Sequence, residues 1–137
     1  MPVDPKHARL VTEILMGSAL AQRLGIRLDT LEPDRVVLRM PFRPDHVTVG
    51  SVVHGGAIAT LVDVAGAAAS ASGAAPEVGG GATSSLALSY LAPADGVDLA
   101  AEARVIQRGR SQTVSDVEVR DPSGRLVAKG LVTSRLF

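Results

Sequence analysis

The stretch VVHGGAIATLVDVAGAAAS, residues 52–70, decides the fold of this 137-residue chain. It is typical of an alanine-rich helix whose first turn lies near His54, and we place the helix at residues 54–72. Its large apolar side chains and two of its alanines recur at helical spacing and form one stripe, which we expect to pack against a sheet. The stripe consists of Ile58, Leu61, Val62, Ala65 and Ala69.

The flanking sequence supplies the strands of that sheet. Helical spacing over residues 5–21 predicts an N-terminal helix within 1–22, ending before Gly25. A glycine-rich loop is expected at 73–82. Alternating apolar residues predict strands at 26–30, 36–42, 83–91, 97–107, 112–120 and 125–135. The order of helix, two strands, helix and four strands indicates one α+β domain over 1–137, an antiparallel sheet wrapped around a long central helix.

The composition argues against several classes of function. Basic and acidic residues both number 14, so a field that would gather nucleic acid or an anionic membrane is not expected. The chain has no cysteine, which excludes disulfides and thiolate metal sites. Neither a signal peptide nor a membrane span is predicted, and we expect a soluble, cytoplasmic protein. His7 and His46 are interpreted as surface residues because no second ligand lies at metal spacing, and no cofactor is expected.

One acid lies within the central helix. Asp63 falls off the apolar stripe, and its neighbours at helical spacing are all small or short. No lysine or arginine occurs between residues 44 and 103, so the carboxylate has no local counter-ion. The alternative is an ordinary solvent-facing acid. The neighbours are Ala59, Thr60, Gly66 and Ala67.

The His-Gly-Gly at the start of the helix favours a functional role for this acid. Backbone N–H groups of Gly55 and Gly56 lie at the positive end of the helix dipole, where they can polarise a carbonyl. Nine residues at about 1.5 Å each place Asp63 about 13 Å from His54, too far for both ends to reach one carbonyl. Two copies with antiparallel helices would bring the two together, so we expect at least a homodimer.

Three segments carry a resemblance to a known family. HGGAIATLVD at 54–63, TSSLALSYLAPA at 83–94 and VIQRGRS at 105–111 together resemble the hotdog-fold acyl-CoA thioesterases, in particular the phenylacetic-acid-degradation-type branch. The resemblance extends from about residue 20 to the end. It implies a hotdog fold, dimers that often form tetramers, and catalysis by Asp63 as general base or nucleophile. It also implies that the Gly55 amide polarises the carbonyl, that His54 shapes the turn and that Thr83 orients the water.

The sequence departs from the family pattern before the helix. Many members carry Asn at the position of Thr48 and Gly at the position of Ser51, so the polar contact of that Asn is either missing here or supplied by Thr48. Another departure is Ala87, where Asn is common.

The coenzyme end is expected at the turn RGRS. Arg108, Arg110 and Ser111 offer two guanidinium groups and a hydroxyl to phosphates, and relatives place basic residues near this turn. A simply solvated hairpin tip is the alternative.

These features predict hydrolysis of an acyl-CoA to the free acid and CoA. Asp63 would either direct the attack of water or form an anhydride, and the residues do not separate these routes. The alternatives are a dehydratase of the same fold that acts on hydroxyacyl thioesters, and a non-catalytic module that binds acyl-CoA. The few aromatic residues and many alanines suggest a modest apolar pocket without choosing between aryl and aliphatic acyl groups.

Overall fold

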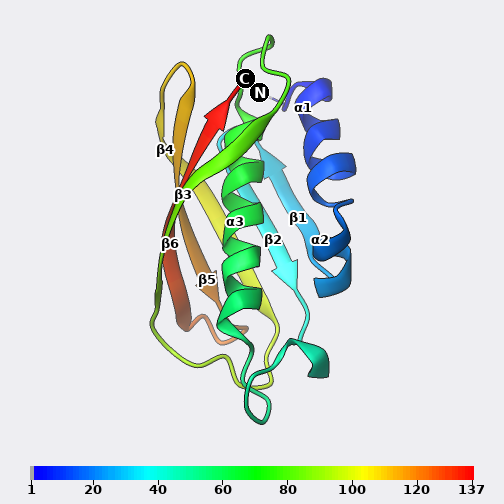
Figure 1. Cartoon of the computed structure of the whole chain (residues 1–137), viewed down its shortest axis with the longest axis vertical. Coiled ribbons are helices and arrows are strands. Elements are labelled where there is room, and N and C mark those ends of the chain that lie inside the picture. The colour runs from blue at the N-terminus through cyan, green and yellow to red at the C-terminus, as the bar shows by residue number, and fades with distance from the viewer. Residues whose placement is uncertain (1) are drawn as a thin grey trace.

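The computed structural model describes residues 2–137, and its core is one helix wrapped by one sheet (Figure 1). The six antiparallel strands follow the order β1-β2-β4-β5-β6-β3 and curve around α3, Gly55–Ser72. This arrangement confirms the α+β architecture predicted from the sequence. The strands are β1 (Arg27–Glu32), β2 (Arg35–Met40), β3 (Gly81–Tyr90), β4 (Leu99–Arg108), β5 (Gln112–Arg120) and β6 (Leu126–Leu136).

The apolar stripe of α3 packs against the concave face of the sheet, as predicted. Leu61 and Val62 are completely buried, and inward-facing residues of the middle strands cover them. Gly66 belongs to this contact, because a Cβ built there would lie 2.5 Å from the Cβ of Val132 on β6. From the sequence, Gly66 was expected on the face of small residues around Asp63. Because Gly66 has no side chain, it instead lets helix and sheet approach closely.

The N-terminal segment is helical but is not the single helix predicted over 1–22. It forms α1 (Pro5–Arg9), a π-helical turn (Leu10–Leu15) and α2 (Ala19–Leu24), which lie beside α3 in Figure 1. Met16 N–H donates to the Val11 carbonyl five residues back, which widens the turn, and the chain is then extended at Ser18. The segment ends at Gly25, as predicted, with φ of +71°.

The two histidines interpreted as surface residues are buried, so that interpretation is wrong. His7 is 1 % exposed, and its Nε2 lies 3.1 Å from the carbonyl oxygen of Val78 in the loop that folds over it. His46 is 4 % exposed and belongs to a short 3-10 turn, Pro44–His46, before the central helix. Its carbonyl accepts the N–H of His54 at 2.6 Å, which fixes the approach of the chain to the first turn of α3.

One helix of the described chain, α3, is long and apolar enough to cross a membrane by length and composition. Most of it is buried within the domain, against the sheet. Its apolar character is therefore accounted for by its place in the core.

Candidate active site

Asp63 lies midway along α3 and contacts one polar side chain. The hydroxyl Oγ1 of Thr83 donates to Oδ1 of Asp63 at 2.6 Å. Thr83 is on β3, next to an irregularity in the pairing of β3 with β6 between Thr83 and Ser85. Within residues 2–137 the carboxylate makes no ion pair. It is half-buried, so an acid without a counter-ion stays accessible to a ligand.

A cavity of about 370 Å³ opens beside this pair. Asp63 and Thr83 line it together with residues of α3, the N-terminal helical segment, the loop before β3 and the end of β6. Its walls are largely apolar, and Asp63 is the only one of the residues that line it with an acidic or basic side chain. The apolar lining comes from Leu10, Ile14, Leu15, Val64, Ala67, Ala71, Val78, Leu136 and Phe137.

The start of α3 presents one backbone donor without a protein acceptor. His54 caps the helix, and its Nδ1 accepts the N–H of Gly56 at 2.7 Å. The N–H of Gly56, predicted to contact substrate, therefore already donates to a protein acceptor. Among the described residues the Gly55 N–H has no acceptor. It lies at the positive end of an 18-residue helix, where an oxyanion would be stabilised.

Tyr90 holds the carbonyl of Gly55, which belongs to the peptide after the one that carries the Gly55 N–H, and this contact was not predicted from the sequence. Its hydroxyl donates to the Gly55 carbonyl at 2.7 Å, and its ring lies against the Gly55 Cα. Tyr90 and Gly55 line a second cavity of about 400 Å³, together with Thr48 and Leu91. Thr48 thus lines the same cavity as Gly55, and its contact with substrate stays a prediction.

The two ends of the site are separated along α3. Eight residues from Gly55 to Asp63 correspond to about 12 Å of helix. β3 runs along this length, because Tyr90 contacts Gly55 and Thr83 contacts Asp63. A single chain therefore does not bring the Gly55 amide and the Asp63 carboxylate to the same carbonyl.

Arg108 has a different environment from the exposed turn predicted for it. Its guanidinium donates to Oδ1 of Asp34 at 2.7 Å and to the carbonyl of Ser70 at 2.9 Å. It also contacts Thr113 Oγ1 at 3.4 Å. Arg108 thus neutralises the C-terminal end of α3, where carbonyl groups carry partial negative charge. This arrangement leaves no support for its predicted role in binding phosphate.

Arg110 and Ser111 are exposed at the turn between β4 and β5. Gly109 N–H donates to the Gln112 carbonyl at 2.8 Å and closes this turn. The contact of Arg110 and Ser111 with a coenzyme stays a prediction.

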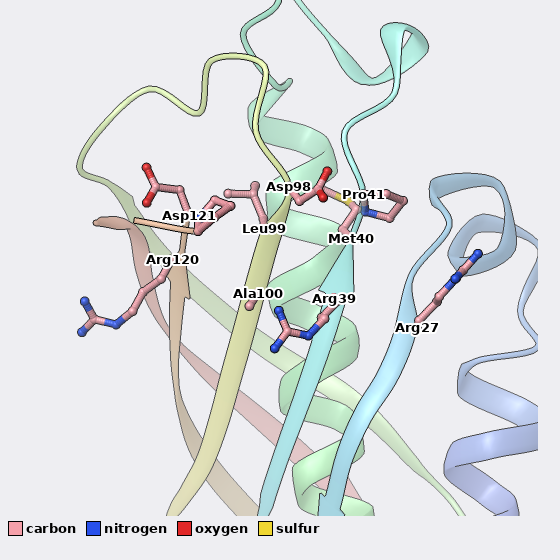
Figure 2. A pocket seen from close by; sticks show the side chains of 10 residues that line it. Arg27, Arg39, Met40, Pro41, Asp98, Leu99, Ala100, Arg120 and Asp121 are labelled. Atoms are coloured by element: carbon pink, nitrogen blue, oxygen red, sulfur yellow. The ribbon is translucent and has the colours of Figure 1, made fainter. Parts of the chain in front are cut away.

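A cavity of about 480 Å³ lies on the outer face of the sheet and not at Asp63. Arg27, Arg39 and Arg120 line it from three strands, and Figure 2 shows that their guanidinium groups do not converge on one point. Its carboxylates already have partners. Asp98 accepts the N–H of Phe42 at 2.7 Å, and the Ser123 hydroxyl lowers the pKa of Asp121 below its usual value. This cavity is a charged, solvated surface.

Comparison with known proteins agrees with this fold. The model of the Thioesterase superfamily matches residues 50–128. A protein of Saccharolobus solfataricus, provisionally named an esterase, is 30 % identical over 90 % of this chain and 81 % of its own. A thioesterase family protein from Silicibacter pomeroyi superposes with a TM-score of 0.88 at 28 % identity, covering 96 % of this chain and 98 % of that one.

The PaaI protein from the phenylacetic acid degradation operon of E. coli shares the fold. Its TM-score is 0.86 at 24 % identity, over 96 % of this chain and 94 % of that one. The family match covers more than half of the chain and includes the whole of α3 with Gly55 and Asp63. Because sequence, topology and superposition agree, this chain belongs to the thioesterase superfamily, a family of hotdog-fold proteins named for thioester hydrolysis.

Proposed function

We propose that this protein hydrolyses acyl-CoA thioesters to the free acid and CoA. Asp63 is the catalytic carboxylate, and the Gly55 N–H is the donor that stabilises the oxyanion. The observation that carries the proposal is the Asp63–Thr83 pair beside a largely apolar cavity. An acid without a counter-ion at such a place can take a proton from water or attack a carbonyl carbon.

The chemistry uses both oxygens of the carboxylate. Thr83 holds Oδ1, so Oδ2 is free to act. In the general-base route, Asp63 takes a proton from water as the water oxygen bonds to the carbonyl carbon. The tetrahedral intermediate then collapses and the C–S bond breaks. The thiolate of CoA leaves and takes up the proton that Asp63 had accepted. In the nucleophilic route, Oδ2 bonds to the carbonyl carbon and expels the thiolate, and water then hydrolyses the anhydride.

The active species is a homodimer with two composite sites. A two-fold axis that sets the α3 helices antiparallel would bring Asp63 of one copy to the Gly55 amide of the other. β3 supports this arrangement because it is an edge strand with one unpaired side. Leu86, Tyr90 and Leu91, on or just after this strand, are 38 %, 54 % and 55 % exposed. An exposed apolar edge strand is rare in a monomer and favours pairing with another copy. Tetramers built from such dimers belong to the same proposal.

The test of the function is thiol release from a panel of acyl-CoAs. We expect Asp63→Asn to lower kcat by about 100-fold or more, because an amide neither accepts the proton nor attacks the carbonyl. Its melting temperature should equal or exceed that of the wild type, since the asparagine keeps an acceptor for Thr83 and removes an unpaired charge.

Asp45→Asn is the matched control, because Asp45 is exposed and outside both cavities. It should retain the wild-type rate. Wild-type turnover by Asp63→Asn would contradict the assignment of the carboxylate. Tight binding of acyl-CoA without any thiol release by the wild type would favour the non-catalytic binding module.

A further inference from the structure

Two loops enclose the cavity that opens at Gly55, and one pair of side chains joins them. The loop before α3, residues 47–53, and the loop after β3, residues 91–96, supply most of the cavity lining. The Oγ of Ser51 in the first loop donates to Oδ1 of Asp95 in the second. Neither of these two side chains lines the cavity. The pair therefore acts on the cavity only through the loops that carry it.

Backbone bonds set the same two loops side by side. The N–H of Val53 donates to the Ala94 carbonyl at 2.9 Å. The N–H of Gly96 donates to the Ser51 carbonyl, also at 2.9 Å. A ribbon of two such short segments is only marginally stable without further contacts. Among the residues that the structure describes, the bond from Ser51 to Asp95 is the only side-chain hydrogen bond between the two loops.

Both loops determine where the Gly55 N–H lies. The loop before α3 leads into His54, whose N–H donates to the His46 carbonyl at 2.6 Å. The loop after β3 follows Tyr90, whose hydroxyl donates to the Gly55 carbonyl at 2.7 Å. Gly55 is therefore held from the first loop through the chain and from the second loop through Tyr90. A shift of one loop against the other moves the Gly55 N–H.

We propose that Ser51 and Asp95 are positioning residues for the oxyanion site, because their hydrogen bond fixes the two loops that hold Gly55. The inference rests on the proposed thioesterase function, in which the Gly55 N–H stabilises the oxyanion. Such a donor depends on distance and angle, so a small displacement lowers the rate. Glycine, which many members of the family carry at the position of Ser51, has no hydroxyl. The bond thus depends on a residue that distinguishes this chain from those members.

The test removes the bond from each side and then restores it. We expect Ser51→Ala and Asp95→Ala each to lower kcat by about three- to tenfold, measured with the acyl-CoA that the wild type hydrolyses fastest. KM should stay nearly unchanged, because neither side chain lines the cavity. The double variant should lose no more than either single variant, since both changes remove the same bond.

Conservative variants separate the hydrogen bond from the mere presence of the side chains. Ser51→Thr keeps the hydroxyl, and Asp95→Asn keeps an acceptor oxygen, so both should retain a kcat near that of the wild type. Both positions are exposed, so water replaces the lost partner in the alanine variants and their melting temperatures should stay close to the wild-type value. A loss of kcat without a loss of stability is the result that a merely structural bond would not give.

Ser123→Ala is the matched control. The Oγ of Ser123 donates to Oδ1 of Asp121 at 2.6 Å in the turn between β5 and β6, so it makes the same kind of exposed bond away from the cavity. This variant should keep the wild-type kcat. Wild-type kcat in Ser51→Ala would overturn the inference, as would an equal loss in Ser123→Ala. A rise in KM alone would also overturn it, because the pair would then shape substrate binding and not the donor.

Amide hydrogen exchange distinguishes the failure of this inference from the failure of the proposed function. If the wild type releases no thiol from any acyl-CoA, the proposed function fails, but exchange still reports how the loops are held. Faster exchange of the Val53 and Gly96 amides in Ser51→Ala, and not in Ser123→Ala, would support the role of the bond between the loops. Unchanged exchange of both amides would reject it.

Discussion

At the scale of single residues, the site depends on groups that lack a partner. Asp63 has a hydroxyl neighbour but no counter-ion, and the Gly55 amide has no acceptor while the adjacent Gly56 amide is capped by His54. Both residues are partly exposed, so these groups stay available to a ligand. Tyr90 differs, since its hydroxyl is paired and holds the Gly55 carbonyl in place, next to the peptide that carries the Gly55 N–H.

Tyr90→Phe tests that positioning role. The variant removes the hydrogen bond to the Gly55 carbonyl but keeps the ring that lies against this residue. We expect kcat to fall by about tenfold with KM nearly unchanged, because Gly55 is no longer held through its carbonyl and its own N–H is then positioned less well for the oxyanion. The hydroxyl is exposed, so the free energy of unfolding should fall by less than about 1.5 kcal/mol. A rise in KM without a change in kcat would instead assign Tyr90 to substrate binding.

The residues of the site were predictable to different degrees, for physical reasons. Asp63 was found because an acid in an apolar helix without nearby lysine or arginine conflicts with its surroundings, and Gly55 because a helix start leaves amides unpaired. Tyr90 was missed because its contact with Gly55 joins residues 35 apart in the sequence. Arg108 was placed in solvent because nothing in the local sequence reveals that Asp34 lies beside it.

At the scale of elements, close approach between α3 and the sheet sets the shape of the core. The apolar stripe of α3 and the alternation in β4 and β5 were predictable, since both follow from periodicity. The break in the N-terminal segment was not, because the bond from Met16 to the Val11 carbonyl and the extended residue after it depend on packing. The role of Gly66 was likewise not predictable, because it depends on the opposing Val132.

Gly66→Ala should destabilise the protein, although alanine normally favours helices. The new methyl group would lie 2.5 Å from the branched carbon of Val132, a rigid neighbour that can move only with β6. We expect the free energy of unfolding to fall by about 1–3 kcal/mol, measured by chemical denaturation. Gly79→Ala is the control, since the nearest atom to its new Cβ is 3.9 Å away. Unchanged stability of Gly66→Ala would show that helix and sheet tolerate a wider separation.

The two arginines of the turn between β4 and β5 should behave differently when each is replaced by alanine. Arg108→Ala leaves Asp34 and two helix carbonyls without their donor, so we expect a loss of about 1–3 kcal/mol in unfolding free energy. Arg110→Ala removes an exposed charge and should leave stability unchanged. If Arg110 binds the coenzyme, its loss raises KM for acyl-CoA but not for the corresponding acyl-pantetheine. An equal rise with both substrates would exclude that contact.

At the scale of the whole molecule, the two proposed catalytic groups lie at separate places on one helix, so the proposed function needs a second copy to join them. The separation of about 12 Å between Gly55 and Asp63 is fixed by an unbroken helix and cannot be closed by side-chain movement. The helix bounds were predictable from sequence, so the separation was also predictable. The surface that we propose for pairing the copies was not predictable, because it follows from the position of β3 at the edge of the sheet.

Mixing two inactive variants tests the composite site. Asp63→Asn keeps the amide donor, and Gly55→Pro keeps the carboxylate but removes the donor. Proline suits the first position of a helix, and His54 before it has φ of −60° and ψ of 133°, the extended conformation that a following proline requires. The nearest obstacle to a new Cβ is the Tyr90 side chain at 3.2 Å, whose exposed ring can shift. Each variant alone should therefore fold but release almost no thiol.

After joint unfolding and refolding, activity should return to about a quarter of the wild-type value. Random assortment makes half of the dimers mixed, and each mixed dimer holds one intact site and one site with both lesions. Each variant refolded alone is the control and should stay inactive, which excludes recovery by refolding itself. Mixed dimers are confirmed with an affinity tag on one variant. If they form but remain inactive, each site is built within one chain, and Asp63 and the Gly55 amide do not act on the same carbonyl.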